Sequence, residues 1–205
     1  MLAGYLRDGR QLRIRYFEDA VIGPGMPGSP SSSEMGGAAY PLDERYRITP
    51  LAEAEDVSPD DVIAFWEREQ SVGRAEALRR VHEVLLVATE HDRAVVGVSS
   101  AYLQRSAQLK MDLWHQRAFV SRDHRHSSVA AHLATGGRDL LEQRFRSGED
   151  TRGAGIAWEV ENEELKRYFN RAHWVWTDFT FIGENAKGDH VRVHYFEGAE
   201  LPDQA

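Results

Sequence analysis

From about residue 46 onward, apolar and polar positions follow the periods of alternating strands and helices. Seven runs have the pattern of strands: Tyr46–Ala52, Val84–Thr89, Val95–Leu103, Lys110–Ser121, Gly155–Val160, Trp174–Ile182 and His190–Phe196. Helical spacing covers the residues after Ser58, then Arg74–Val81, Ser127–Arg146 and Glu163–Ala172. Because this order mixes hairpins with βαβ crossovers, it predicts an α/β protein of the α+β type, with helices on both faces of a mixed sheet.

Short local signals support two of these boundaries and predict one further turn near the N-terminus. The segment Ser58–Asp61 places a hydroxyl at a helix N-cap, proline at the first helical position and carboxylates in the first turn. Asp8-Gly9 separates two short strand-like runs, and Lys187–Asp189 separates the last two strands. Glycine tolerates the backbone angles of tight turns, so both sites predict hairpins.

The chain divides by composition into four segments. Residues 1–21 are predicted to form an N-terminal hairpin arm. Residues 22–45 are rich in Gly, Pro and Ser and bury too little apolar area to offset chain entropy, so we expect a flexible linker. The main domain is predicted at residues 46–197, and residues 198–205 are predicted to be a C-terminal tail.

Composition excludes several classes of protein. Among 205 residues, Asp and Glu number 33 against 25 Lys and Arg, a formal net charge of −8, so nucleic acid is not the expected partner. The chain has no cysteine, which removes disulfide scaffolds, thiol nucleophiles and Cys-based zinc sites. No apolar run approaches the ~18 residues that span a bilayer. The first ten residues lack the apolar core of a secretory signal, and we expect a cytoplasmic protein.

The candidate chemistry lies where the strand ending near Val120 passes into a helix. Polar residues form the turn, and small residues at 127, 128 and 130 open the helix. Backbone amides at 126–130 would lie at the positive end of the helix dipole, which suits a diphosphate, and Arg125 would add a charge-assisted contact. An ordinary strand-to-helix turn with a serine N-cap has the same residue types, and this alternative stays open.

With this order of elements, the chain resembles the GNAT superfamily of acetyl-CoA-dependent N-acyltransferases over about residues 46–197. The family's cofactor motif, Q/R-x-x-G-x-G/A, reads here as Arg125-His126-Ser127-Ser128-Val129-Ala130, and Val120 is the apolar residue five positions earlier. Residues 162–174, NEELKRYFNRAHW, resemble the family stretch N-x-x-A-x-x-x-Y-x-x-x-G-F.

The resemblance implies a seven-stranded, mostly antiparallel mixed sheet that splays between its fourth and fifth strands. It also implies that pantetheine lies in that opening and bonds to backbone groups of the fourth strand. Acetyl-CoA, or another acyl-CoA, is the implied cosubstrate, and no metal is implied. The implied cofactor-binding residues are Phe119, Val120, Arg125, His126, Ser127, Ser128, Val129, Ala130 and Asn162.

The sequence departs from the family pattern at two positions. Ser128 stands where the motif has its first glycine, which narrows the space for the diphosphate. Strict register puts Phe169 where many members carry a tyrosine acid, and Tyr168 lies one position earlier, about 100° around the helix. Tyr168 is the candidate acid, with another group or water as the alternative.

A general base is also needed, because the attacking amine must be neutral. His115 is one candidate, since imidazole titrates in the useful range. Glu159 is a second, and Glu161 has the same strand parity. The remaining candidates, on the fourth strand and before the second, are Asp112, His82 and Glu83.

The sequence thus predicts transfer of an acetyl or short acyl group from CoA to a primary amine of a small molecule or peptide. The alternative is a GNAT-like module that binds acyl-CoA or a partner with weak or no turnover. A homodimer formed through the N-terminal arm or the closing hairpin is also expected, and no membrane partner is.

Overall fold

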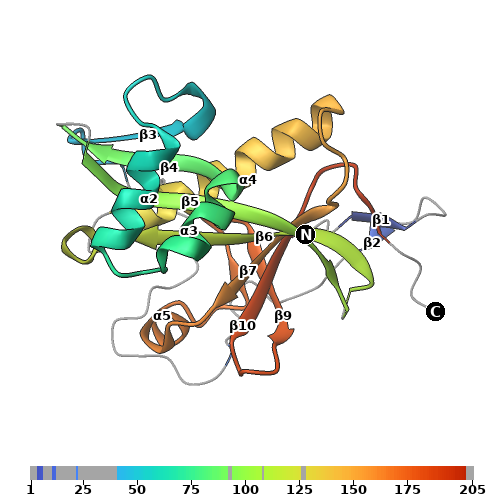
Figure 1. Ribbon diagram of the computed structural model, residues 1–205. Helices are drawn as coiled ribbons and strands as arrows, with labels where there is room; N and C mark the ends of the chain where they lie inside the picture. The colour runs from blue at the N-terminus through green and yellow to red at the C-terminus, as the bar shows by residue number, and fades with distance from the viewer. Residues whose placement is uncertain are drawn as a thin grey trace. The chain divides into compact units, whose positions relative to one another are not determined.

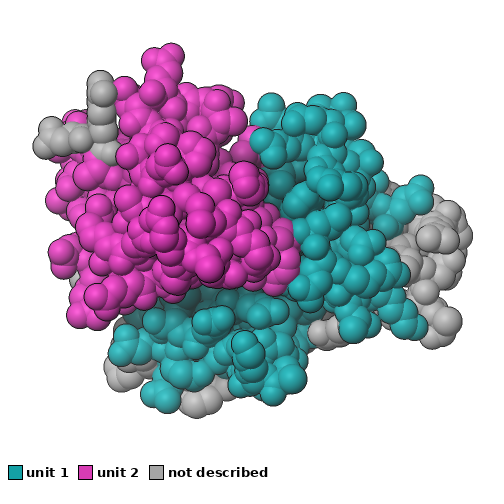
Figure 2. Space-filling model, in the orientation of Figure 1, with its two compact units in different colours: residues 1–39, 103–115, 141–205 teal, residues 40–102, 116–140 magenta. Residues whose placement is uncertain are grey.

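The computed structural model describes residues 4–6, 11–12, 22, 41–91, 94–107, 109–125 and 128–201 (Figure 1). The chain forms two compact units, coloured separately in Figure 2. Unit 1 contains residues 1–39, 103–115 and 141–205, and unit 2 contains residues 40–102 and 116–140. The predicted linker falls mostly on residues 23–40, which lie outside the described residues.

Eight strands form the main sheet, in the order β3-β4-β5-β6-β7-β10-β9-β8. Their bounds are β3 Tyr46–Pro50, β4 Val84–Glu90, β5 Ala94–Ser106, β6 Met111–Val120, β7 Gly155–Val160, β8 His173–Trp174, β9 Phe179–Glu184 and β10 His190–Tyr195. The pairs β3–β4, β4–β5, β7–β10, β10–β9 and β9–β8 are antiparallel. This confirms the prediction of an α/β fold built on a mostly antiparallel sheet.

The count of seven strands was wrong by one, because the run predicted as Trp174–Ile182 is broken in the middle. The amides of Thr177 and Asp178 both donate to the carbonyl of Trp174, at 3.2 and 2.7 Å. Asp178 has a φ of 56°, in the left-handed region that strands do not use. The resulting turn separates β8 from β9.

In unit 2, helices cover both faces of the strands. Helix α2 (Pro59–Arg68) begins at the predicted N-cap, Ser58, and the structure adds a capping box in which Ser58 and Asp61 exchange hydrogen bonds. Together with α3 (Arg74–Arg80) and the short helix η2 (Val81–Glu83), it packs on the face that carries Val87. The opposite face, marked by Leu86, lies under the first half of helix α4 (Val129–Ser147). The short helices η1 (Leu51–Glu53) and η3 (Arg122–His124) follow β3 and β6.

In unit 1, β7 and β10 pair in register from His190 opposite Val160 to Tyr195 opposite Gly155. Helix α5 (Glu163–Tyr168) follows β7 and ends four residues before the predicted end at Ala172. A core cluster contains Met111, Leu113, Ala157 and Val193. A backbone hydrogen bond joins the start of β6 to the residue before β7: the Ala154 amide donates to the carbonyl of Asp112 at 3.0 Å.

A second, three-stranded sheet in unit 1 joins segments near the two ends of the chain. Strand β1 (Gly4–Leu6) pairs antiparallel with β2 (Gln11–Leu12) and parallel with β11 (Glu200–Leu201). The predicted turn at Asp8-Gly9 lies outside the described residues. None of the helices among the described residues is long and apolar enough to cross a membrane.

Candidate active site

The turn that the sequence singled out lies in unit 2, between the end of β6 and the start of α4. The amide of Ser121 donates to the carbonyl of Val96 at 2.9 Å, which fastens the end of β6 to β5. His124 Nδ1 lies 2.8 Å from the hydroxyl of Tyr46, and the two rings meet edge to face. The turn is therefore fixed to β3 and β5. His126 and Ser127 lie outside the described residues.

Helix α4 starts with backbone donors that precede its own hydrogen-bond ladder. The carbonyl of Ser128 accepts from the amide of His132 at 3.1 Å, the first bond of the helix. The amides of Ala130 and Ala131 come before that bond and have no partner within the helix. Their side chains are methyl groups, and the helix dipole is positive here. This helix start suits a phosphate group.

Two side chains at the turn make contacts that the sequence did not predict. The hydroxyl of Ser128 donates to the carbonyl of Pro41 at 3.0 Å, so Ser128 holds the segment that precedes β3. Arg125 Nε donates to the carbonyl of Val120 at 3.3 Å. The Arg125 guanidinium lies 5.9 Å from the ring of Phe119, which packs on Phe65. Arg125 is exposed and borders the start of the helix.

In unit 1 the structure brings together two candidate bases that the sequence treated separately. Nδ1 of His115, on β6, lies 3.9 Å from Oε1 of Glu159, on β7. The His115 side chain is 12% exposed and that of Glu159 38%. Glu159 Oε2 also accepts from Asn185 Nδ2 at 3.3 Å. The structure therefore brings an imidazole and a carboxylate together on two neighbouring strands.

The other candidate bases do not join this pair. Asp112 Oδ2 accepts from Arg105 at 3.1 Å, in an exposed ion pair. Glu83 Oε2 accepts from Arg117 at 3.4 Å, and Glu161 is exposed just after β7. Asp112 and Glu83 thus each pair with an arginine.

The residues expected around α5 have different surroundings. Asn162 Oδ1 accepts from the amide of Leu165 at 2.9 Å, which makes Asn162 the N-cap of α5. The Tyr168 side chain is 40% exposed and touches Phe169 edge to face. Phe169 instead packs on Trp174 and Trp176, with ring centroids 5.7 and 5.9 Å apart.

A buried arginine that the sequence analysis did not single out explains why α5 ends early. Arg192, on β10, is 0% exposed and lies 3.8 Å from the ring centroid of Trp174. Its guanidinium donates to the carbonyls of Phe169, Arg171 and Ala172 at 3.4, 2.8 and 3.2 Å. Burial lowers the pKa of Arg192 to about 9. These bonds hold residues 169–172 in a path that leaves the helix at Phe169, whose backbone angles are no longer helical.

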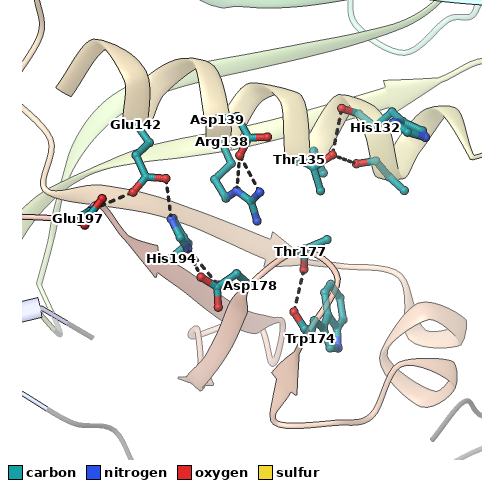
Figure 3. Close-up of polar contacts among 12 residues, drawn as sticks. His132, Thr135, Arg138, Asp139, Glu142, Trp174, Thr177, Asp178, His194 and Glu197 are labelled. Carbon is teal, nitrogen blue, oxygen red and sulfur yellow. Dashed lines mark hydrogen bonds and ion pairs between the residues drawn. The ribbon is translucent and has the colours of Figure 1, made fainter. Parts of the chain in front are cut away.

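Two residues further along β10, His194 lies between two carboxylates (Figure 3). Its Nδ1 is 3.1 Å from Asp178 Oδ2, and its Nε2 is 3.3 Å from Glu142 Oε2, on α4. Glu142 also accepts from the amide of Glu197 at 2.9 Å. The network ties the β8–β9 turn to the second half of α4. The sequence feature that could have pointed to this network is the pair of polar residues Arg192 and His194, which lie on one face of the last predicted strand.

Unit 2 also contains a pocket of about 550 Å³ beside strands β3 and β4. Carboxylates outnumber guanidiniums in its lining, and none of the predicted site residues contributes to it. The lining consists of Glu44, Arg45, Tyr46, Arg47, Thr49, Glu53, Ala54, Glu55, Asp56, Val57, Val87, Thr89, Glu90 and His91. Among the described residues, no cluster of His, Asp and Glu has the arrangement of a metal site.

Comparison with known proteins identifies the fold. No family model matches the chain, and no curated protein is similar in sequence. The fold is similar to that of an acetyltransferase of solved structure, as the sequence resemblance implied. A ribosomal-protein-S5-alanine acetyltransferase from Vibrio fischeri is 10% identical, with a TM-score of 0.51 over 77% of this chain and 97% of that one. A bacterial toxin is 7% identical, with a TM-score of 0.52 over 74% and 91%.

Proposed function

We propose that the chain is an N-acyltransferase that moves an acetyl or short acyl group from acyl-CoA to a primary amine. The observation that carries this proposal is the start of α4, on an acetyltransferase fold. There, the amides of Ala130 and Ala131 precede the helix's own hydrogen bonds, and exposed Arg125 lies five residues before Ala130 in the sequence. Backbone donors, small side chains and a cation are the groups that bind a diphosphate.

These residues fit acetyl-CoA, the cosubstrate that the fold implies. The amides of residues 128–131 and the Arg125 guanidinium hold its diphosphate, and backbone groups of Phe119 and Val120 hold its pantetheine. Asn162, also implied as a cofactor-binding residue, is the N-cap of α5. When bound, acetyl-CoA supplies an activated acyl thioester. Ser128 contributes its amide, while its hydroxyl holds Pro41.

The proton transfers are assigned to unit 1. His115 takes the proton from the attacking amine, and the Glu159 carboxylate 3.9 Å away stabilises the imidazolium that forms. Tyr168, whose side chain is 40% exposed, donates the proton to the leaving thiolate. The acceptor is a small-molecule or peptide amine.

A binding module without turnover is the second candidate function. Its support is Phe169, which stands at the motif position where many members have a tyrosine and is packed on Trp174 and Trp176. A phenyl ring has no proton to donate. This candidate keeps the cofactor contacts at α4 and gives up only the chemical step.

Calorimetric titration with acetyl-CoA, followed by thiol release over a panel of primary amines, separates these candidates. Binding and release with at least one amine supports the enzyme, and binding without release supports the module. Ser128→Glu tests whether the diphosphate binds at the start of α4, because the new carboxylate would repel it. The same carboxylate interacts favourably with the positive end of the helix dipole, so the fold is expected to persist. We expect at least a tenfold loss of affinity. Ser147→Glu, at the other end of α4, is the charge-matched control. Unchanged affinity in Ser128→Glu rejects this site.

A further inference from the structure

Helix α4 carries two adjacent glycines in its middle, Gly136 and Gly137. In a helix interior, glycine is less favourable than alanine by about 1 kcal/mol. Beneath this part of the helix lies Gln116, on β6, which is 4% exposed. Its Oε1 is buried and has no hydrogen-bond partner within the described residues. Three unfavourable features therefore coincide where α4 rests on β6.

The amide of Gln116 is bound to the helix backbone. Its Nε2 lies 3.2 and 3.1 Å from the carbonyls of Leu133 and Ala134, and 2.9 Å from the hydroxyl of Ser99. An oxygen at this position would face two carbonyl oxygens, so the nitrogen must point this way. Gln116 thus joins the second turn of α4 to β5 and β6.

Gly137 allows this close approach. A Cβ on Gly137 would come within 2.3 Å of Gln116 Nε2 and 2.9 Å of Ser99 Oγ. Neither atom can move away without breaking the hydrogen bonds that hold it. Gly136 differs, because its Cβ would meet only the end of the Leu86 side chain, at 2.9 Å. A terminal methyl group can rotate out of contact.

We propose that Gln116, Ser99 and Gly137 form a positioning lock that sets the distance between α4 and β6, and with it the placement of the phosphate-binding amides. Leu133 lies about one helical turn after Ala130, and Gln116 lies four residues before Val120. The lock therefore holds both ends of the segment that contains the turn. This inference rests on the proposed function for its ligand.

Local conflicts of this kind are expected at functional sites rather than in the ordinary core. An unpaired buried acceptor costs about 1–3 kcal/mol, and an apolar side chain with alanines on the helix would avoid that cost. The hydrogen bonds of Gln116 fix the position of α4 relative to β6, because hydrogen bonds are directional and apolar contacts are not.

The test compares two glycine variants of the same helix in the full chain. Gly137→Ala is expected to weaken acetyl-CoA binding at least tenfold in calorimetric titration, whereas Gly136→Ala stays within about twofold of the unchanged protein. Replacing Gln116 by alanine removes the side-chain amide that the Cβ at position 137 would meet. When Gly137→Ala is added to Gln116→Ala, it is therefore expected to lower the affinity for acetyl-CoA less than threefold. Should Gly137→Ala fail to fold, Gln116→Glu, which turns an oxygen toward both carbonyls, is expected to show the same tenfold loss.

A ligand-free readout keeps this test separate from the proposed function. The amide of His132 makes the first hydrogen bond of α4, and Gly137→Ala is expected to speed its hydrogen exchange at least tenfold, unlike Gly136→Ala. If the unchanged protein binds no acetyl-CoA but this contrast in exchange is seen, the lock stands and the proposed function falls. Equal affinity and equal exchange in the two glycine variants would overturn the lock.

Discussion

Replacing Arg192 tests how a buried guanidinium supports the loop after α5. The side chain is fully buried, donates to three backbone carbonyls and lies 3.8 Å from the ring centroid of Trp174. None of the ion pairs described for the resolved part of the chain gives Arg192 a carboxylate. Methionine removes the charge and the donors, whereas lysine keeps the charge but cannot reproduce the planar set of donors.

The magnitudes decide which variant is worse. Three carbonyls left without donors cost on the order of 1–3 kcal/mol each, and the lost cation–π contact about 2 kcal/mol. Against this, burial lowers the pKa of Arg192 to about 9, so removing the charge returns on the order of 5 kcal/mol. We expect Arg192→Met to lower the free energy of unfolding by about 3 kcal/mol. Arg192→Lys gains no such relief and is expected to cost at least as much.

Urea unfolding, followed by circular dichroism and tryptophan fluorescence, measures both changes. Arg152→Met is the control, because Arg152 also lies over a tryptophan, Trp114, but its side chain is 67% exposed. We expect no measurable change in its unfolding midpoint. The reasoning is refuted if Arg192→Lys is clearly milder than Arg192→Met, or if both variants are as stable as the unchanged protein.

Two further predictions concern the same unit. Burial lowers the pKa of His190 in the folded protein. Below the ordinary histidine pKa of 6.5, the unfolded chain therefore binds more protons than the folded one. Stability that is present above that pH is lost as the pH falls. Urea unfolding at pH 7 and pH 5 should show a smaller loss in His190→Asn, and an unchanged loss would contradict this assignment. Asn162→Ala removes the N-cap of α5 and is expected to cost about 1 kcal/mol by the same method, whereas Asn162→Asp should cost little.

The sequence predicted those parts of the fold that depend on local signals. Ser58 was predicted as a helix N-cap from its neighbours Pro59, Asp60 and Asp61, and α2 begins there. The end of α5 was not predictable in this way, because the carbonyls that follow it are bound by Arg192, more than twenty residues later in the sequence. The break between β8 and β9 depends on a left-handed backbone at Asp178, which its residue type permits but does not require.

In the candidate site, too, local features could be predicted from the sequence and contacts between distant residues could not. The turn at residues 120–130 could be found from its motif, since the motif is contiguous. The approach of His115 to Glu159 depends on how β6 and β7 align, which no local pattern determines. The contact between Gln116 and α4 had a visible signal, two glycines inside a predicted helix, but their partner lies on a different strand.

The central claim is that the amides opening α4 bind the diphosphate of an acyl-CoA. Titration of ¹⁵N-labelled protein with acetyl-CoA, followed by two-dimensional NMR, tests it at single amides. If the diphosphate binds at the start of α4, the largest changes in chemical shift are expected at the amides of Ala130 and Ala131, with much smaller changes at the far end of α4 near Ser147. Saturable binding that leaves these two amide signals in place would contradict it.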